Sequence, residues 1–453
     1  MRVAWFSPWP PQPSGIAGRS VDAVHALAAR GHAVSVFVDD RVVPDLGREP
    51  DDPAAPGTVR VESAHQFPWR QGRGQHDLIV YQLGNSRLHD YLWPYLFRYP
   101  GLTVLHDARL HHARARTLLT PARQTHYRAE FAFNHPDVPN DAAELAVHGF
   151  DGRYYYLWPM TRSVVAASRL VAAHSRGGAA HLTASHPDRP CHYIPLGEGV
   201  QDVPSTEERL SWRAQLGLPD HAVLCGTFGA LTADKRVEPI LRAFARTRRR
   251  HPSASLLLAG APDGSVDTRR LAESLGIAEG VIWLEGLDDR AFDRAIASVD
   301  VSLHLRWPTA VETSGPWLRA LSAGRPTVMV ELAHQTHVPA LDPRNWQPLN
   351  PHDAASPVTV AIDILDEDHS LGLALDRLLS DDALRTSLGT AARAYWEREH
   401  TVARMVDGYE DVMTRAVRAP APTDDLPDAL RPDPWRHTRA LVAPFGDIRC
   451  ELP

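Results

Sequence analysis

The side chains best suited to chemistry lie in one segment, residues 306–324, where a single carboxylate, Glu312, stands directly before Thr313, Ser314 and Gly315. Thr313 and Ser314 are typical first residues of a short helix. The backbone N–H groups of a helix start are unpaired and positively polarised, so they suit an anion such as a diphosphate. Glu312 suits hydroxyl groups instead. A nucleotide-sugar site needs this combination, although an ordinary strand–loop–helix connection with a capping serine explains the segment equally well.

A basic pair follows the first strand predicted in the C-terminal half. Lys235 and Arg236 stand at the entrance of a predicted helix, residues 237–250. The helix dipole disfavours cations at this end, so their presence indicates an anionic ligand. The alternative is a solvated pair, because the arginines at residues 248–250 show that the chain is rich in surface arginine.

The N-terminal half offers two further groups at the ends of predicted strands. A proline- and glycine-rich loop with Ser14, Gly15 and Ile16 follows the strand at residues 3–7, and His106 ends the strand at residues 102–106. Parallel α/β sheets bind their ligands at these strand ends, so both features predict a cleft. We interpret His106 as a residue that hydrogen-bonds or handles a proton; the alternative is a buried histidine bonded to backbone.

Two other kinds of site are disfavoured by spacing. His106, Asp107, His111 and His112 are potential metal ligands, but adjacent residues do not converge on one ion as an i, i+4 helix pair does. The three cysteines form no C-x-x-C pair, which argues against a zinc site or a disulfide framework. We therefore expect no metal.

Dinucleotide binding is a rival interpretation of the glycine loop. Gly15 and Gly18 have the spacing G-x-x-G, and the fingerprint requires G-x-G-x-x-G. Asp39 and Asp40 end the second strand, where we interpret them as surface-loop residues and not as a ribose contact. A dehydrogenase is accordingly the weakest of the enzyme hypotheses.

Strands and helices alternate along both halves of the chain, which predicts the α/β class with parallel sheets. Strands are predicted at residues 3–7, 33–38, 78–82, 102–106 and 170–174, and then at residues 223–228, 255–259, 281–284, 299–305 and 326–330. The predicted parts are an N-terminal domain at residues 1–197 with a helical insertion at about 108–159, a C-terminal domain at 198–399, a helix at 400–417 that returns to the first domain, and a proline-rich tail at 418–453.

Length and composition limit the class of protein. A chain of 453 residues is expected to form at least two domains. A formal charge of −7 gives no electrostatic footprint for nucleic acid. No stretch approaches the roughly 18 apolar residues of a membrane span, and the first apolar run is too short for a signal peptide. We predict a cytoplasmic protein, for which binding to the inner face of the membrane stays open.

With these pieces in order, residues 2–416 resemble the GT-B glycosyltransferases, and among them the retaining family 4. In the N-terminal half, the loop at residues 13–17 is similar to that family's glycine loop, and His106 to its histidine at a strand end. Residues 194–197 are similar to its linker. Lys235 looks like the lysine that pairs with the donor diphosphate, and residues 312–326 look like an E-T-S-G variant of its E-x7-E region.

The chain departs from that family at two positions. Ala230 stands where an arginine is usual, so Arg236 or Arg306 is predicted to supply the missing contact to the diphosphate. Arg319 stands near the place of the second glutamate, which in the family holds the ribose. The nucleotide base therefore cannot be predicted.

The resemblance implies two Rossmann-like domains that face each other across a cleft. It implies transfer of a sugar, with retention of configuration, from a nucleotide-diphosphate-sugar co-substrate to a glycan, lipid-linked or small-molecule acceptor, without an obligatory cofactor or metal. His106 and Glu312 are the predicted catalytic residues. The predicted donor contacts are Ser14, Gly15, Ile16, Lys235, Arg236, Arg306, Thr313, Ser314, Gly315 and Arg319. A nucleotide-sugar epimerase on the same fold and a non-catalytic nucleotide-binding or regulatory protein are the alternatives.

Overall fold

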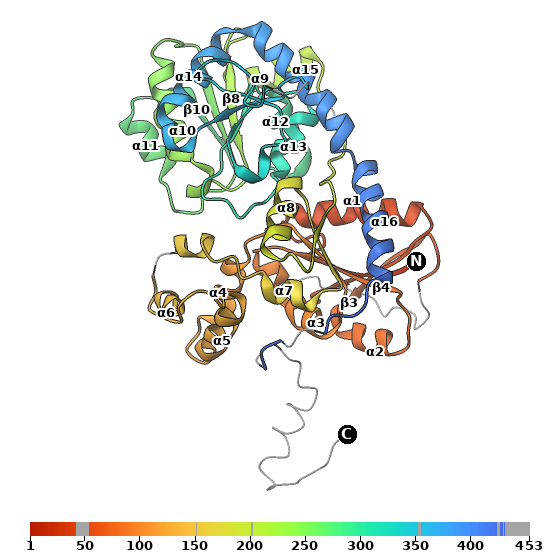
Figure 1. Ribbon diagram of the computed structural model, residues 1–453. Helices are drawn as coiled ribbons and strands as arrows, with labels where there is room; N and C mark the ends of the chain where they lie inside the picture. Colours follow the sequence, from red (N-terminus) through yellow and green to blue (C-terminus); the bar gives the residue numbers. More distant parts are fainter. Residues whose placement is uncertain are drawn as a thin grey trace, which may run out of the picture.

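The computed structural model describes residues 1–41, 54–150, 152–200, 203–351, 355–423, 426–428 and 430. It contains two α/β domains, each built on a parallel sheet, and Figure 1 shows the N-terminal domain below the C-terminal one. The predicted class, two Rossmann-like parallel α/β domains, is confirmed.

The N-terminal sheet has seven strands in the order β3-β2-β1-β4-β5-β6-β7. They are β1 (Arg2–Phe6), β2 (Ala33–Val38), β3 (Val59–Ser63), β4 (Leu78–Leu83), β5 (Leu102–Leu105), β6 (Leu170–Ala173) and β7 (Cys191–Tyr193). Strands β2 and β4 are buried along their whole length, because helices cover both faces of the sheet.

The helices of this domain fall into two groups. Those beside the sheet are α1 (Gly15–Ala29), α2 (Phe67–Gly72), α3 (Trp93–Arg98), α7 (Arg162–Ala167) and α8 (Arg176–Ser185). The insertion holds α4 (His111–Leu118), α5 (Gln124–Asn134), α6 (Asp141–Val147) and the 3-10 turn Gly152–Tyr156. The insertion has its own apolar cluster, in which Tyr127, Phe131 and Met160 are buried. It therefore forms a separate lobe at the side of the sheet (Figure 1).

The C-terminal sheet also has seven parallel strands, in the order β10-β9-β8-β11-β12-β14-β13. They are β8 (Leu224–Phe228), β9 (Ser255–Ala259), β10 (Val281–Leu284), β11 (Val301–His304), β12 (Thr327–Val330), β13 (Ala340–Leu341) and β14 (Thr359–Ile362). The helices are α9 (Thr206–Gln215), α10 (Val237–Arg248), α11 (Thr268–Ser274), α12 (Asp289–Ser298), α13 (Gly315–Ser322), α14 (Glu367–Ser380), α15 (Asp382–Glu399) and α16 (Val402–Arg418).

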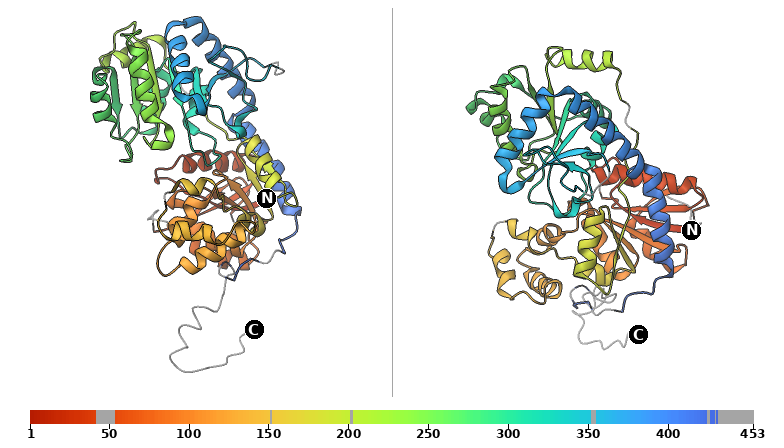
Figure 2. Two further views of the ribbon diagram at one scale, coloured as in Figure 1. Left: turned by 60° about the vertical axis from the view of Figure 1, so that its left-hand side comes forward. Right: turned by 45° about the horizontal axis from the view of Figure 1, so that its top comes forward.

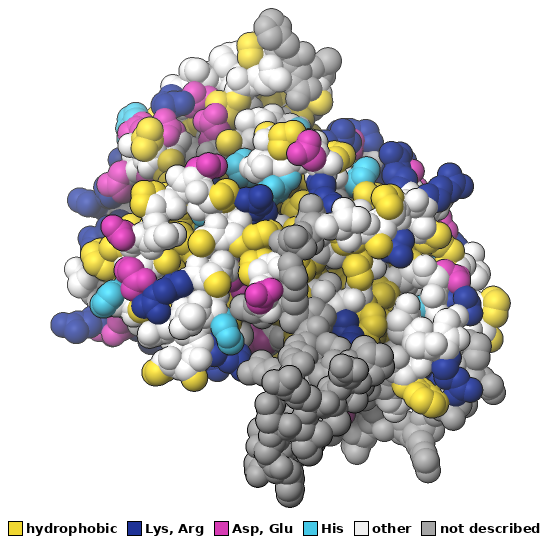
Figure 3. Space-filling model, turned by 60° about the horizontal axis from the view of Figure 1, so that its bottom comes forward, with side chains coloured by type: hydrophobic (Ala, Val, Ile, Leu, Met, Phe, Trp, Pro, Cys, Tyr) yellow, Lys and Arg dark blue, Asp and Glu magenta, His cyan; other side chains and the backbone are white. Residues whose placement is uncertain are grey.

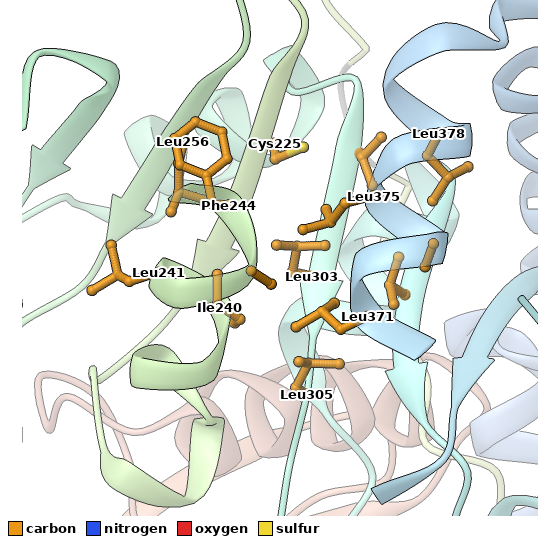
Figure 4. Packing of buried hydrophobic residues seen from close by; sticks show 14 of the residues in the cluster. Cys225, Ile240, Leu241, Phe244, Leu256, Leu303, Leu305, Leu371, Leu375 and Leu378 are labelled. Atoms are coloured by element: carbon orange, nitrogen blue, oxygen red, sulfur yellow. The ribbon is translucent and has the colours of Figure 1, made fainter. Parts of the chain in front are cut away.

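The core of the C-terminal domain lies between its sheet and two helices. Figure 4 shows Phe244 of α10 and Leu375 of α14 on the same side of the sheet as Leu303 of β11, and all three are buried. This apolar layer makes the sheet a rigid support for the loops at its strand ends.

Helix α16 leaves the C-terminal domain and packs on the N-terminal one. Its Met405, Val406 and Tyr409 are buried in the cluster of the N-terminal sheet, and the ring of Tyr409 lies 5.1 Å from that of Trp5. Figures 1 and 2 show α16 crossing from the upper to the lower domain, with α1 along the side that faces the C-terminal domain. The domain boundaries near residues 197 and 399 stay a prediction.

Four strands, β3, β7, β13 and β14, were not predicted. β3, β7 and β13 form sheet edges and β14 lies beside β13. β3 and β7 are only partly buried, so they need no continuous apolar run, and β13 has only two residues. Helices α14, α15 and α16 follow one another along the chain and are divided by the capping residues Asp381 and Thr401. The predicted tail from residue 418 lies largely outside the described residues.

The described residues show neither of two membrane- or polyanion-binding features, a spanning helix and, on the face in Figure 3, a strongly charged patch. Within the described ranges no helix is both long and apolar enough to cross a bilayer. On the face shown in Figure 3, basic and acidic side chains are interspersed. This distribution agrees with the modest net charge of −7.

Candidate functional site

One cavity lies between the domains and a second adjoins it in the C-terminal domain, and Glu312 lines both of them. The larger has a volume of about 290 Å³ and is bordered by the starts of α1 and α13 and by His106 and Asp107. The smaller, of about 30 Å³, extends into the C-terminal domain and reaches Lys235 and Arg306. The strand ends of both sheets therefore meet at one cleft.

A serine caps each helix that opens into the larger cavity. The Ile16 N–H donates to Ser14 Oγ at 3.2 Å, and the Trp317 N–H donates to Ser314 Oγ at 3.4 Å. Of the two predicted caps of α13, Ser314 and not Thr313 occupies the position. Within the described part of the chain, the backbone N–H groups of Ser314 and Gly315 meet no acceptor. Two positively polarised helix ends thus face the same space.

Glu312 is oriented by its own loop. Thr309 Oγ1 donates to Glu312 Oε2 at 2.9 Å, and Arg306 Nε lies 2.6 Å from Glu312 Oε1. Arg306 also pairs with Asp234, with 2.6 Å between Nη1 and Oδ2. Since each carboxylate oxygen can accept more than one hydrogen bond, Glu312 keeps capacity for hydroxyl groups in the cavity.

Lys235 lies in the smaller cavity, just before the start of α10. Its Nζ donates to the Phe228 carbonyl at 2.9 Å. Burial and the neighbouring charge of Arg306 lower the pKa of Lys235 to about 7. Gly229, at a φ of 85°, makes room for it, because a Cβ there would lie 2.5 Å from Nζ. An anion in this cavity would favour the charged form of the amine.

The His106 ring forms its hydrogen bond with a side chain and not with backbone. Its Nε2 lies 2.8 Å from Gln82 Oε1, which also accepts from the Tyr409 hydroxyl at 3.1 Å. An acceptor at Nε2 places the ring proton there, so Nδ1 is the bare nitrogen. Burial and the nearby His174 hold the pKa of His106 well below its ordinary value. The ring is therefore neutral and suited to accept a hydrogen bond.

Sequence reasoning missed Asp107 as a member of this site. Its Oδ2 accepts from the Asn85 N–H at 2.7 Å, and it lines the larger cavity. Burial and the charge of Glu312 raise its pKa to about 7. The available signal was its position beside His106 at the same strand end. Two carboxylates, one from each domain, therefore face the same cavity.

Arg19 and Glu198 were missed as well. They form a buried ion pair between α1 and the interdomain linker, with 3.0 Å from Arg19 Nη1 to Glu198 Oε1. Arg19 lines the larger cavity. Only the tertiary fold brings these residues together, since 179 positions separate them.

Two predicted donor-binding arginines are not brought to the cavities. Arg236 Nε donates to Glu367 Oε1 at 2.7 Å, beside α14. Arg319 Nη1 donates to Asp293 at 2.7 Å, and its Nε lies 3.6 Å from Glu198. Neither lines either cavity. Of the two candidates named for the missing diphosphate contact, only Arg306 faces the site.

The composition of the chain also singles out Lys235. Lys235 is the only lysine among the 48 lysine and arginine residues of the chain. The missing side chain of Gly229 leaves space for this amine, since a Cβ there would lie 2.5 Å from Nζ. As for metals, the described residues contain no group of three or more histidine, cysteine or acidic residues arranged to hold one.

Comparisons with known proteins bear on the fold that carries this site. Residues 208–330 match the family model described as glycosyl transferases group 1. Along 92% of this chain and 100% of its own, Anabaena Alr3699/HepE, solved with UDP and glucose, superposes with a TM-score of 0.60 at 15% identity. The fold is GT-B.

Other GT-B proteins are similar in the same way. A sucrose-phosphate synthase from Thermosynechococcus elongatus superposes with a TM-score of 0.63 over 93% of this chain and 100% of its own, at 15% identity. By sequence, a D-inositol 3-phosphate glycosyltransferase from Stackebrandtia nassauensis is 28% identical over 228 residues. That match spans about half of each chain, 47% in both cases. The likeness to solved GT-B structures therefore establishes the fold, and the match to the family model is limited to residues 208–330.

Proposed function

We propose that the protein is a hexosyltransferase-type glycosyltransferase that moves a sugar from a nucleotide-diphosphate sugar to an acceptor hydroxyl. One observation carries this proposal: a lysine, a helix N-terminus and a carboxylate from the C-terminal domain line two adjoining cavities, and residues of the N-terminal domain line the larger of the two. The group 1 glycosyl transferase match and the UDP-bound neighbour support it.

The diphosphate would lie between Lys235 and the start of α13. The free N–H groups of Ser314 and Gly315 and the Lys235 amine would stabilise the negative charge that develops on the leaving group. Arg306 is already paired with Asp234 and Glu312, and its positive charge would add to the stabilisation of the diphosphate. In this arrangement, the N-terminal loop at Ser14 closes over the donor.

The sugar would lie in the larger cavity. Glu312 would accept hydrogen bonds from its hydroxyl groups, and the neutral His106 would accept another at Nδ1. By family resemblance, the configuration at the anomeric carbon is retained and the leaving phosphate helps to deprotonate the acceptor. No Asp-x-Asp motif stands at a suitable loop in the sequence, so the proposal includes no obligatory metal. The acceptor would enter from the N-terminal domain and its insertion.

A thermal-shift screen with UDP, GDP, ADP and dTDP tests donor binding. At least one of them is expected to raise the melting temperature, because a ligand at a hundredfold its dissociation constant adds about 2.7 kcal/mol to the unfolding free energy. UDP is the first choice because the Anabaena neighbour contains it. If none of the four stabilises the protein, the proposal is wrong. Conversion of a donor sugar without any acceptor would instead favour an epimerase.

Removal of the cap of α13 tests the helix start more finely. Ser314→Ala is expected to lower the unfolding free energy by about 1 kcal/mol and to weaken binding of the nucleotide found in the screen, because the first turn frays. Ser205 caps α9 in the same manner and lies in neither cavity. Ser205→Ala should therefore lower the unfolding free energy without any change in nucleotide affinity. Equal nucleotide affinity in the two variants would contradict this role of α13.

A further inference from the structure

The loop that carries Glu312 enters the other domain through Val311. This side chain is 9% exposed and belongs to the apolar cluster of the N-terminal sheet, although Val311 lies between two elements of the C-terminal domain. Its Cγ1 would lie 3.3 Å from a Cβ placed on Gly178, at the start of α8. The absence of a side chain at Gly178 thus leaves the socket in which Val311 lies.

The backbone of Val311 is held in an unfavourable conformation. Its φ is 66°, in the left-handed region that β-branched residues rarely adopt. Such a conformation persists only where the surroundings compensate for it. Burial of the isopropyl group in the N-terminal domain supplies that compensation, and it exists only while the two domains are in contact.

Two hydrogen bonds between the domains flank this residue. The Ala108 N–H donates to the Ala310 carbonyl at 2.8 Å, and Thr313 Oγ1 donates to the His174 carbonyl at 3.1 Å. Ala108 directly follows the His106–Asp107 pair. The loop is therefore attached to the N-terminal domain on both sides of Glu312.

One hydroxyl connects the buried residue to the carboxylate. Thr309 Oγ1 accepts from the Val311 N–H at 2.9 Å and donates to Glu312 Oε2 at 2.9 Å. A change in the backbone of Val311 therefore moves the group that orients Glu312. The orientation of this carboxylate depends on what Val311 contacts.

We infer that Val311 is a positioning residue that makes the placement of Glu312 depend on domain closure. When the domains are in contact, the socket compensates for the left-handed backbone and Glu312 faces the cavity. When they separate, that compensation is lost, and the loop relaxes together with Glu312. The inference rests on the proposed function for the role of Glu312, whereas the docking of the loop stands apart from any reaction.

Hydrogen exchange in the ligand-free protein tests the docking. Val311→Ala keeps the unfavourable φ without the isopropyl group that compensates for it. Val311→Gly removes the side chain and also the strain of the positive φ. In either variant the Ala108 amide is expected to exchange at least about tenfold faster than in the wild type, because its bond to Ala310 opens more often. Val338→Ala is the matched control, since Val338 is 7% exposed in an apolar cluster of the C-terminal domain. It should leave the Ala108 amide unchanged.

Steady-state kinetics with the donor found in the screen tests the consequence. Val311→Ala is expected to lower kcat about tenfold with little change in the donor KM, because Glu312 is misplaced while the diphosphate contacts remain. Val338→Ala should match the wild type. If Val311→Ala gives the same Ala108 exchange rate and the same kcat as Val338→Ala, the inference is wrong. If exchange responds but the wild type transfers no sugar, the docking stands and the proposed function fails.

Discussion

Replacement of Glu312 by glutamine is expected to lower kcat by about two to three orders of magnitude, with a much smaller effect on nucleotide binding. Glutamine keeps the size of the side chain and can still accept from Thr309 Oγ1. It removes the negative charge that faces the larger cavity, where the sugar is proposed to lie. Because the proposed phosphate contacts come from Lys235 and α13, UDP should still stabilise the variant.

The same variant should change the titration of Asp107. The charge of Glu312 contributes to the raised pKa of Asp107, about 7, so its removal should lower that pKa. Infrared difference spectra of the protonated carboxyl band would follow the shift without any turnover. This readout separates a local electrostatic change from general loss of structure.

Glu331→Gln is the matched control for these measurements. Glu331 is exposed, lies one residue after β12 and lines neither of the two adjoining cavities. The control should retain wild-type kcat and leave the pKa of Asp107 unchanged. Wild-type turnover in Glu312→Gln, with the fold intact by thermal unfolding, would remove Glu312 from the proposed mechanism.

The sequence predicted the architecture because the central strands are continuous apolar runs. β2 and β4 are buried on both faces and stand out without any structure, whereas the edge strands β3 and β7 are only partly buried and resemble loops. The order of strands and helices then implies a parallel sheet. The topology in turn predicts which strand ends face a ligand. Ser14 and His106 could therefore be named from the sequence, and both line the larger cavity.

Pairing between distant residues could not be predicted in the same way. Arg236 and Arg319 have the right position along the chain for anion binding, but Glu367, 131 residues away, and Asp293 engage their guanidinium groups. Nothing local in the sequence identifies these partners. The same limitation hid Arg19, which only the fold brings beside Glu198.

Lys235 presents the opposite case, because its identity carried information that spacing did not. Arginine serves at every other basic position, so this one lysine marks a place where a compact amine is required. Gly229 beside it has no side chain, which leaves the space that the amine occupies. A lysine with a lowered pKa in a cavity is also a common feature of functional sites.

The largest expected effect on donor binding comes from Lys235→Met. This variant should lower kcat/KM by about two to three orders of magnitude, because the charge beside the leaving diphosphate is lost. The free protein should nevertheless become more stable, since methionine fills similar space without a buried amine to desolvate. Arg236→Met is the matched control one residue away: it breaks the pair with Glu367, so it should lose stability and keep donor affinity.

The pH dependence of this stability gain has a definite sign. The pKa of Lys235 is about 7 in the folded protein, below the ordinary 10.5. Between these values the unfolded chain binds a proton that the folded one does not, so wild-type stability rises with pH across this window. The advantage of Lys235→Met should thus be full below pH 7 and vanish as the pH approaches 10.5. Denaturant unfolding of both proteins at pH 6, 8 and 10 measures it. A stability difference that stays constant with pH would contradict a lowered pKa of the Lys235 amine. A variant that binds UDP as tightly as the wild type would show that this amine does not contact the donor.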